Sequence, residues 1–215
     1  MVGLRGKGSE IEEDTSSVSR QHVVHLTSVH RPLDTRILHK ECQSLSRAGY
    51  RVTLIAQHER DEVIDYGVEL VGVRKAPNRL LRMTTTVAQV YREALQLDAD
   101  MYHLHDVELL PIGLLLRARG KHVIYDAHEH MPRCVLSRPY LTPGSRKLLS
   151  WFIDGLERFS VRHLSGVIAA YPSIADRLSP FNPRTVIVSN YALRDELSLQ
   201  TSKPWRARSM SVAYV

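Results

Sequence analysis

Short apolar segments alternate along the chain with segments in which apolar residues recur every three or four positions. The short segments are rich in β-branched residues, as in His22–Thr27 (HVVHLT) and Arg51–Ala56 (RVTLIA), which is typical of buried strands. Segments of this kind predict strands at residues 22–27, 51–56, 68–73, 101–105, 122–126, 166–170 and 185–188.

Helical spacing in the intervening segments predicts the helices. The first begins at Asp34 and Thr35, and Gly49 is placed to end it because glycine adopts the left-handed conformation at little cost. The longest spans Ser145–Leu164, and we expect its apolar stripe to pack inward. The stripe consists of Leu148, Leu149, Phe152, Leu156 and Phe159. Further helices are expected near residues 87–94, 110–119 and 174–178.

Strands buried on both faces and alternating with helices predict an α/β fold with a doubly wound parallel sheet, Rossmann-like in topology. We expect this domain to cover residues 21–190. Residues 1–20 mix Gly, Ser and charges of both signs without periodicity, which predicts a mobile tail. Residues 191–209 are polar and basic like a linker, and the apolar run at 210–215 is expected to begin a missing second domain.

Composition narrows the class of protein. Of 215 residues, 43% are hydrophobic and 24% are charged, as in ordinary globular proteins. No apolar stretch approaches the roughly 20 residues that span a bilayer, and the N-terminus lacks the apolar core of a signal peptide. The two cysteines, Cys42 and Cys134, are too few for a disulfide framework. We therefore expect a cytoplasmic protein.

The charge balance favours an anionic partner. The chain has 29 Lys and Arg against 23 Asp and Glu, which gives a formal net charge of +6. Nucleic acid, phosphate-bearing ligands and acidic lipid all fit such a charge. The alternative is a basic protein whose charge serves solubility alone. The cations are dispersed and lack interleaved aromatic residues, which argues against nucleic acid as the partner.

Polar side chains follow three of the predicted strands. Ligands bind at the carboxyl ends of parallel strands, so these side chains form the candidate site. They are His30, Asp34 and Arg36 after the first strand, His105, Asp106 and Glu108 after the fourth, and His128, Glu129 and Arg133 after the fifth.

Several of these residues also have a local structural interpretation. Asp34 can cap the first helix, and Arg36 can pair with Asp34 or Glu41. The two carboxylates after the fourth strand precede a helix, whose dipole favours them there. His103, inside a strand, is expected to be a packed core histidine. The convergence of three strand ends favours a binding site over these separate explanations.

The sequence lacks the usual motifs for a metal or a nucleotide cofactor. His103 and His105 share a strand face, but the run from His103 to Asp106 departs from the metallo-hydrolase spacing His-x-His-x-Asp-His. The whole sequence contains no Gly-x-Gly-x-x-Gly turn, no Gly-Lys-Ser/Thr phosphate loop and no Gly-x-Ser-x-Gly elbow. We expect neither a metal ion nor a cofactor in this domain.

Three motifs together resemble bacterial family 4 glycosyltransferases. They are His30–Glu41 (HRPLDTRILHKE), His103–Gly113 (HLHDVELLPIG) and Val123–Glu129 (VIYDAHE). Ser189-Asn190, after the last predicted strand, resembles the strand end that precedes the interdomain crossover of that family. The resemblance extends from about Gln21 to Val215.

The resemblance implies one half of a GT-B enzyme, in which two Rossmann-like domains face each other across a cleft. In that family the N-terminal domain mainly holds the acceptor, the C-terminal domain holds the nucleotide-sugar, and transfer retains anomeric configuration without a metal. By this resemblance His128 is the catalytic histidine that reaches the donor sugar, and the other strand-end residues line the acceptor side. Arg36 or Arg133 would hold a phosphate if the acceptor is lipid-linked.

The implied function is transfer of a sugar from a nucleotide-sugar to a saccharide or lipid-linked acceptor, in surface polysaccharide or glycoconjugate synthesis. Because the donor-binding domain is missing, the chain alone is expected to be inactive. The alternative from another class is a non-catalytic sugar- or ligand-binding Rossmann-like module.

The long helix also predicts peripheral contact with the inner face of the cell membrane. Lys147, Arg158 and Arg162 fall on one side with Trp151, a combination that suits anionic lipid, although Asp154 shares that side. The alternative is a solvated face with Trp151 folded back onto the core.

Overall fold

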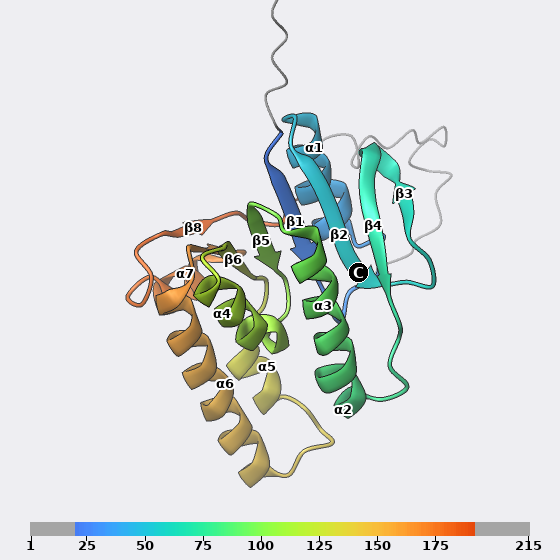
Figure 1. Cartoon of the computed structure of the whole chain (residues 1–215). Helices are drawn as coiled ribbons and strands as arrows, with labels where there is room; N and C mark the ends of the chain where they lie inside the picture. The colour runs from blue at the N-terminus through green and yellow to red at the C-terminus, as the bar shows by residue number, and fades with distance from the viewer. Residues whose placement is uncertain (1–19, 192–215) are drawn as a thin grey trace, which may run out of the picture.

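The computed structural model describes residues 20–191, and within them one sheet of eight strands (Figure 1). The strand order is β3-β4-β2-β1-β5-β6-β7-β8, and every neighbouring pair is parallel except β3 and β4. This order confirms the predicted α/β fold with a doubly wound, Rossmann-like sheet. The strands are β1 (His22–Leu26), β2 (Arg51–Gln57), β3 (Glu62–Ile64), β4 (Val68–Val73), β5 (Met101–Leu104), β6 (His122–Ala127), β7 (Gly166–Ala169) and β8 (Thr185–Ile187).

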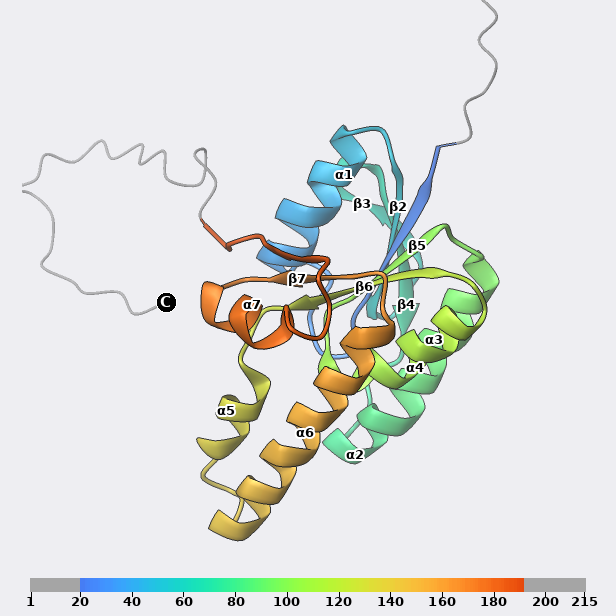
Figure 2. The same cartoon turned by 90° about the vertical axis from the view of Figure 1, so that its left-hand side faces the viewer.

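Helices cover both faces of the sheet. η1 and α1 lie on one face, and α3, α4 and α6 lie on the other, as Figures 1 and 2 show from two directions. Gly49 ends the first helix as predicted, with a φ of 91°. The helical segments are η1 (Thr35–Cys42), α1 (Gln43–Arg47), η2 (Asp65–Gly67), α2 (Arg79–Leu81), η3 (Arg82–Thr86), α3 (Val87–Leu97), η4 (Val107–Leu109), α4 (Leu110–Ala118), α5 (Met131–Leu136), α6 (Pro143–His163) and α7 (Pro172–Leu178).

The two faces of the sheet differ in polarity. On the face covered by α3, α4 and α6, the central strands contribute apolar side chains such as Leu26 and Leu104 to the larger core cluster. On the α1 face, apolar side chains from η1 pack against β2 and β4. The central strands β1, β5 and β6 instead bury imidazoles and a carboxylate there: His25, His103, His105 and Asp126. His103 is thus the buried histidine that the sequence predicts, but it lies in a polar layer.

The expectation that the apolar stripe of α6 packs inward holds for Leu156, which packs against the larger core cluster, but it is wrong for the other four residues of the stripe. Leu148 is 67% exposed and Phe152 is 58% exposed, whereas Glu157, Ser160 and Val161 are buried. α6 has 21 residues, about 31 Å of helix, but β7 has four, about 13 Å of strand. The first half of α6 therefore projects past the sheet and lies beside α5 (Figure 1). The alternative that Trp151 folds back onto the core is also wrong, because this side chain is 75% exposed.

Three of the predicted segments lie outside the described residues: the N-terminal tail, the linker beyond Tyr191 and the final strand at 210–215. The domain boundaries therefore stay predictions. Among residues 20–191, no helix combines the length and apolar character needed to cross a membrane.

Candidate functional site

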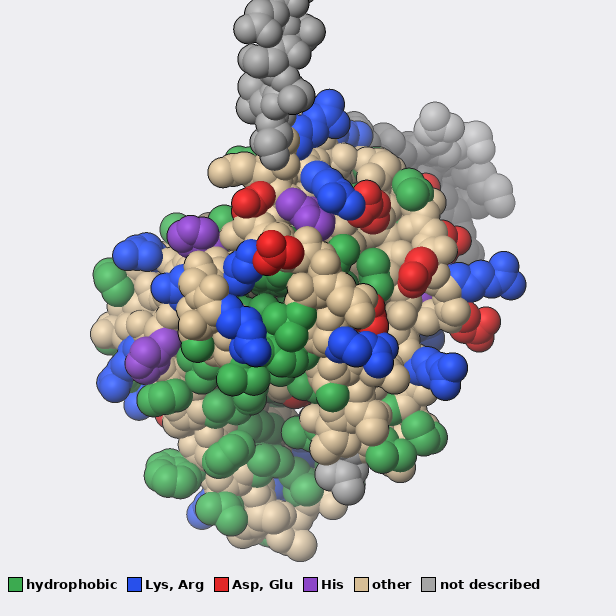
Figure 3. Space-filling view, in the orientation of Figure 1, with side chains coloured by type: hydrophobic (Ala, Val, Ile, Leu, Met, Phe, Trp, Pro, Cys, Tyr) green, Lys and Arg blue, Asp and Glu red, His purple; other side chains and the backbone are tan. Residues whose placement is uncertain are grey.

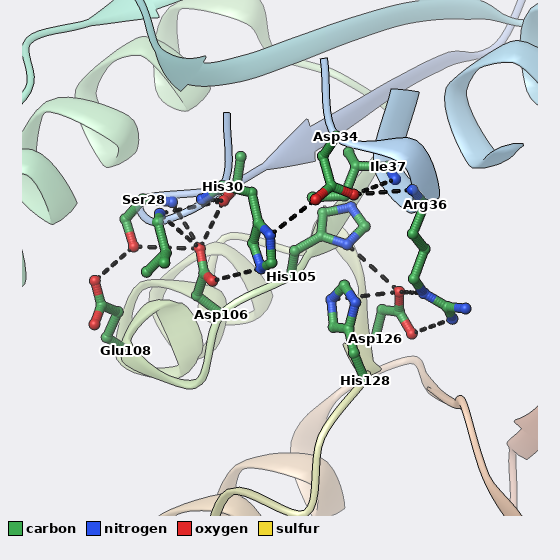
Figure 4. Close-up of polar contacts among 12 residues, drawn as sticks. Ser28, His30, Asp34, Arg36, Ile37, His105, Asp106, Glu108, Asp126 and His128 are labelled. Carbon is green, nitrogen blue, oxygen red and sulfur yellow. Dashed lines mark hydrogen bonds and ion pairs between the residues drawn. The ribbon is translucent and has the colours of Figure 1, made fainter. Parts of the chain in front are cut away.

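A pocket of about 250 Å³ opens at the carboxyl ends of β1, β5 and β6. The three strand ends therefore converge as the sequence predicts, and the close-up in Figure 4 shows their polar side chains facing one another. The predicted site residues that line the pocket are His30, His105, Asp106, Glu108, His128 and Glu129. The other lining residues are Val29, Arg79, Arg82, Val107, Tyr125, Met131 and Arg138.

Asp106 fixes the loop that follows β1. Its Oδ2 accepts hydrogen bonds from Thr27 Oγ1 at 2.8 Å and from the backbone N–H of Ser28 at 2.7 Å. Glu108 accepts from Ser28 Oγ at 2.7 Å and pairs with Arg82 at 2.9 Å. These carboxylates follow β5, so they tie the ends of two adjacent strands together and shape one wall of the pocket.

Asp34 is a helix cap, as the local interpretation predicts. Its Oδ1 accepts from the backbone N–H groups of Arg36 and Ile37 at 2.9 and 3.0 Å. Its Oδ2 lies 3.2 Å from Nδ1 of His30. Burial raises the pKa of Asp34, but the hydrogen bonds from His30 and these N–H groups outweigh burial and hold the pKa well below 3.8. The bond to Asp34 in turn raises the pKa of His30 above 6.5.

Arg36 is buried and does not line the pocket of about 250 Å³ described above. Its guanidinium binds Asp126 through two contacts, Nε to Oδ2 at 2.9 Å and Nη2 to Oδ1 at 2.8 Å. Nε also lies 3.0 Å from Oε1 of Glu41, so one of the predicted local partners is present. Burial raises the pKa of Asp126, but hydrogen bonds from His105 and Arg36 outweigh burial and hold this pKa well below its usual range. Arg36 is therefore a positioning residue for Asp126.

Three imidazoles beneath the pocket are uncharged at neutral pH. Burial, together with the neighbouring imidazoles, lowers the pKa of His103 and of His105 to about 3. Burial and His103 also lower the pKa of His25. Glu41 lies beside them, and its burial, with the nearby Asp126 carboxylate, raises its pKa to about 10.

His128 stands between two pockets. Besides the larger pocket, it lines a second one of about 210 Å³ together with His30, Asp34, Arg36 and Asn190. The rings of His30 and His128 are stacked with centroids 5.4 Å apart. His128 Nε2 lies 3.6 Å from Asp126 Oδ2, and burial lowers the pKa of this imidazole despite that carboxylate. A neutral imidazole therefore faces both pockets.

Some functional candidates differ from the sequence prediction. Arg133, on α5, is exposed and is absent from the lining of either pocket. The pocket is instead lined by Arg79, Arg82 and Arg138, three residues that the sequence pattern did not single out. These three lie outside the strand ends, so the rule that located the other residues gave no signal for them.

The comparison with protein families agrees with the three motifs. The family described as Glycosyltransferase Family 4 matches residues 35–190. The chain belongs to glycosyltransferase family 4. The matched range contains the η1 helix and both pockets apart from the loop between β1 and η1.

Solved structures of GT-B glycosyltransferases have the same fold. Sucrose-phosphate synthase from Thermosynechococcus elongatus aligns with a TM-score of 0.59 and 12% identity over 79% of this chain and 48% of that chain. The catalytic domain of starch synthase IV from Arabidopsis thaliana, bound to ADP and acarbose, aligns with a TM-score of 0.53 and 13% identity over 80% of this chain and 52% of that chain. This family 4 chain thus spans about half the length of these relatives. The comparison with curated proteins finds no match.

Proposed function

We propose that this domain is the acceptor-side half of a retaining glycosyltransferase. It moves a sugar from a nucleotide-sugar to a saccharide or lipid-linked acceptor. The observation that supports the proposal most is that His30 and His128 line both pockets. Two substrates held in adjacent pockets meet at these side chains, as group transfer requires.

The chemistry of the pocket suits sugar hydroxyls. Neutral His128 donates a hydrogen bond to a hydroxyl of the donor sugar and favours the oxocarbenium-like charge distribution of transfer. Carboxylates such as Asp106 accept hydrogen bonds from acceptor hydroxyls, and guanidiniums donate them. Since Arg36 is bound by Asp126, Arg79 and Arg138 are the better candidates for holding a phosphate of a lipid-linked acceptor.

The donor side of the proposal rests on the relatives. Because the GT-B structures are about twice as long as the aligned region, we assign the nucleotide-sugar to a second domain that follows this one. In this proposal the transfer step uses no metal ion, the enzyme works in the cytoplasm, and its product enters surface polysaccharide or glycoconjugate synthesis.

Replacing His128 tests the proposal. In the enzyme that contains this domain, we expect His128→Ala to lower kcat by about 100-fold or more, with a change in Tm of a few degrees at most. Release of nucleoside diphosphate measures kcat. His130→Ala is the matched control, because His130 lies two residues further along the same loop and lines neither pocket. Activity within a fewfold of wild type, together with a sharp fall in Tm, would make His128 a structural residue.

The alternative function is a non-catalytic module that binds sugars or related ligands. The same pocket favours it, since hydroxyl-binding groups alone do not require transfer. The module is the correct interpretation if the wild-type protein binds saccharides, shows no turnover of a nucleotide-sugar, and binds saccharides more weakly after His128→Ala.

We further propose that α6 contacts an anionic membrane. Leu148, Trp151, Phe152 and Phe159 are exposed beside one another on this helix, and hydrophobic side chains gather over α5 and α6 in Figure 3. Lys147, Arg158 and Arg162 flank them and are exposed. Apolar side chains next to cations fit a bilayer surface, where each cation contributes on the order of 1 kcal/mol. Arg158 already pairs with Asp154 at 2.8 Å, which reduces the contribution of Arg158 to lipid binding.

Co-sedimentation with liposomes tests this contact. We expect binding to vesicles that contain anionic lipid, weaker binding as salt rises, and loss of binding when Lys147, Arg158 and Arg162 become Glu. Reversal of Arg47, Arg60 and Lys75, exposed cations distant in sequence from α6, is the matched control and leaves binding largely intact. Equal binding to neutral vesicles, or no binding to anionic ones, would contradict the membrane contact and favour an acceptor substrate that is soluble.

A further inference from the structure

A buried polar cluster lies beneath the pocket, between the sheet and η1. His25 on β1 pairs in register with His103 on β5, so their side chains are neighbours on the α1 face. His105, two residues after His103, points to the same face, and Glu41 from η1 covers all three imidazoles. All four side chains are buried or nearly so, with His25 and His105 at 0% and Glu41 at 13% exposure.

The four candidate ligand atoms of this cluster lie within 4.8 Å of one another. Glu41 Oε2 lies 4.0 Å from His25 Nδ1, 3.8 Å from His103 Nδ1 and 3.9 Å from His105 Nε2. His25 Nδ1 and His105 Nε2 are 2.9 Å apart. A tetrahedral ion with bonds of about 2.1 Å separates its ligand atoms by about 3.4 Å. The observed distances lie on both sides of that value, so small side-chain movements admit an ion.

Hydrogen bonding within the described residues leaves the cluster incomplete. Glu41 Oε2, which lies within 4.0 Å of all three imidazoles, has no hydrogen-bond partner. Nε2 of the fully buried His25, the ring nitrogen that does not face Glu41, has none either. Buried polar atoms are normally satisfied, which makes this concentration of unsatisfied atoms unusual.

The surroundings also match those of a metal site. Nδ1 of His105 lies 3.5 Å from Oδ2 of Asp126, which is in turn fixed by Arg36. A ligating histidine commonly donates its second ring N–H to a carboxylate, which orients the ring toward the metal. The alternative trio of His105, Asp126 and His128 is a weaker site, because both oxygens of Asp126 are already bound by Arg36.

We propose that His25, His103, His105 and Glu41 form a buried, structural site for a zinc-like divalent transition-metal ion. Three nitrogens and one carboxylate oxygen are a four-coordinate set that suits zinc, whereas Mg²⁺ and Ca²⁺ prefer all-oxygen ligands. The ion would stabilise the junction of β1, β5 and η1 beneath the pocket, and it would hold the imidazole of His105, which also lines that pocket. The proposal departs from the sequence prediction that this domain binds no metal.

Metal titration of the full chain tests the proposal. The untagged protein is stripped with a chelator and titrated with Zn²⁺, with bound zinc measured by elemental analysis and calorimetry. We expect one zinc per chain and a rise in Tm on binding. Glu41→Gln, which has the shape of the protonated side chain, is expected to fold, to bind zinc at least tenfold more weakly and to lose the rise in Tm. His58→Gln removes a partly exposed imidazole and is the matched control with unchanged affinity.

Cobalt supplies a readout that needs no variant. Co²⁺ in a closed four-coordinate site gives an intense visible absorption, whereas cobalt on surface histidines gives a weak octahedral spectrum. An intense spectrum, displaced by zinc, supports the site even if Glu41→Gln does not fold. Absence of stoichiometric zinc, equal affinity in wild type and Glu41→Gln, or a weak octahedral spectrum would overturn the proposal and leave a hydrogen-bonded cluster of neutral histidines.

Discussion

At the scale of single residues, Asp126 organises the site. It is fully buried, it holds Arg36 through two hydrogen bonds, and it contacts the imidazoles of His105 and His128. Because these partners come from the first helix, the residue after β5 and the loop after β6, one carboxylate links the elements that form the pocket. Arg36, which the sequence placed in the acceptor site, acts here through Asp126.

Asp126→Asn is expected to destabilise the fold by about 3 kcal/mol, because it removes the carboxylate that holds the buried Arg36 through two hydrogen bonds and leaves Glu41 as the acidic group beside the guanidinium. Chemical denaturation measures the loss. Glu69→Gln is the matched control: Glu69 pairs with Arg51 at 2.9 Å, but both side chains are largely exposed, so we expect a loss below about 1 kcal/mol. Equal losses in the two variants would show that Arg36 does not depend on Asp126.

The pair of His30 and Asp34 predicts a dependence on pH. The folded-state pKa of His30 lies above 6.5, so its contribution to stability is complete below that value and is lost as pH rises through the folded pKa. The pKa of Asp34 lies below 3.8, so its contribution is present above that value and is lost as pH falls through the folded pKa. Asp34→Asn is expected to lower the pKa of His30, measured by NMR titration. An unchanged pKa would contradict the pairing.

At the scale of elements, strand ends and helix lengths decide where the chemistry and the exposed surface lie. β1, β5 and β6 are parallel neighbours, so the residues that follow them meet at one edge. α6 is far longer than the strands it packs against, which exposes the apolar face of its first half. α4 shows the opposite case. It is a short helix that packs closely against side chains of β5 and β6, because Gly113 at the contact has no side chain.

Gly113→Ala is expected to destabilise the fold by about 1 kcal/mol or more. A Cβ at Gly113 would overlap Cδ1 of the fully buried Leu104 and lie 3.5 Å from Val123 Cγ1. Gly155→Ala is the matched control within a helix, because a Cβ there meets nothing within 4 Å. It is expected to stabilise α6 by about 0.5–1 kcal/mol. Denaturation curves measure both, and a stabilised Gly113→Ala would show that α4 can move off the sheet.

At the scale of the whole molecule, the chain aligns with about half of a GT-B enzyme. The described half contains the proposed acceptor pocket and His128, whereas the proposed donor site belongs to the other half. Transfer requires both substrates at one place. In this proposal the described domain can therefore bind an acceptor by itself, but turnover of a donor requires both halves.

The chain of 215 residues is therefore expected to show no turnover of a nucleotide-sugar. Release of nucleoside diphosphate in the presence of saccharide acceptors measures turnover, with a complete GT-B enzyme run alongside as the positive control. Turnover above the background without protein would contradict the assignment of the donor site to a second domain.

The sequence determined the local features of this protein. Apolar periodicity located seven of the eight strands in the described chain, but it missed β3, whose three residues lie among charged neighbours. It also identified the Asp34 cap, the Gly49 helix end and the strand-end residues that meet at the pocket. These features follow from spacing within a few residues, because backbone preference and side-chain period are local properties.

Only the tertiary structure decided which of these side chains meet. Arg36 and Asp126 are 90 residues apart in the sequence, and His25 and His105 are 80 apart. Their contacts depend on the order of strands in the sheet and on which face each residue takes. The exposure of Trp151 likewise depends on how far α6 extends past β7. A helix stripe read from the sequence gives the direction in which apolar side chains point, but the length of the neighbouring element determines whether anything covers them.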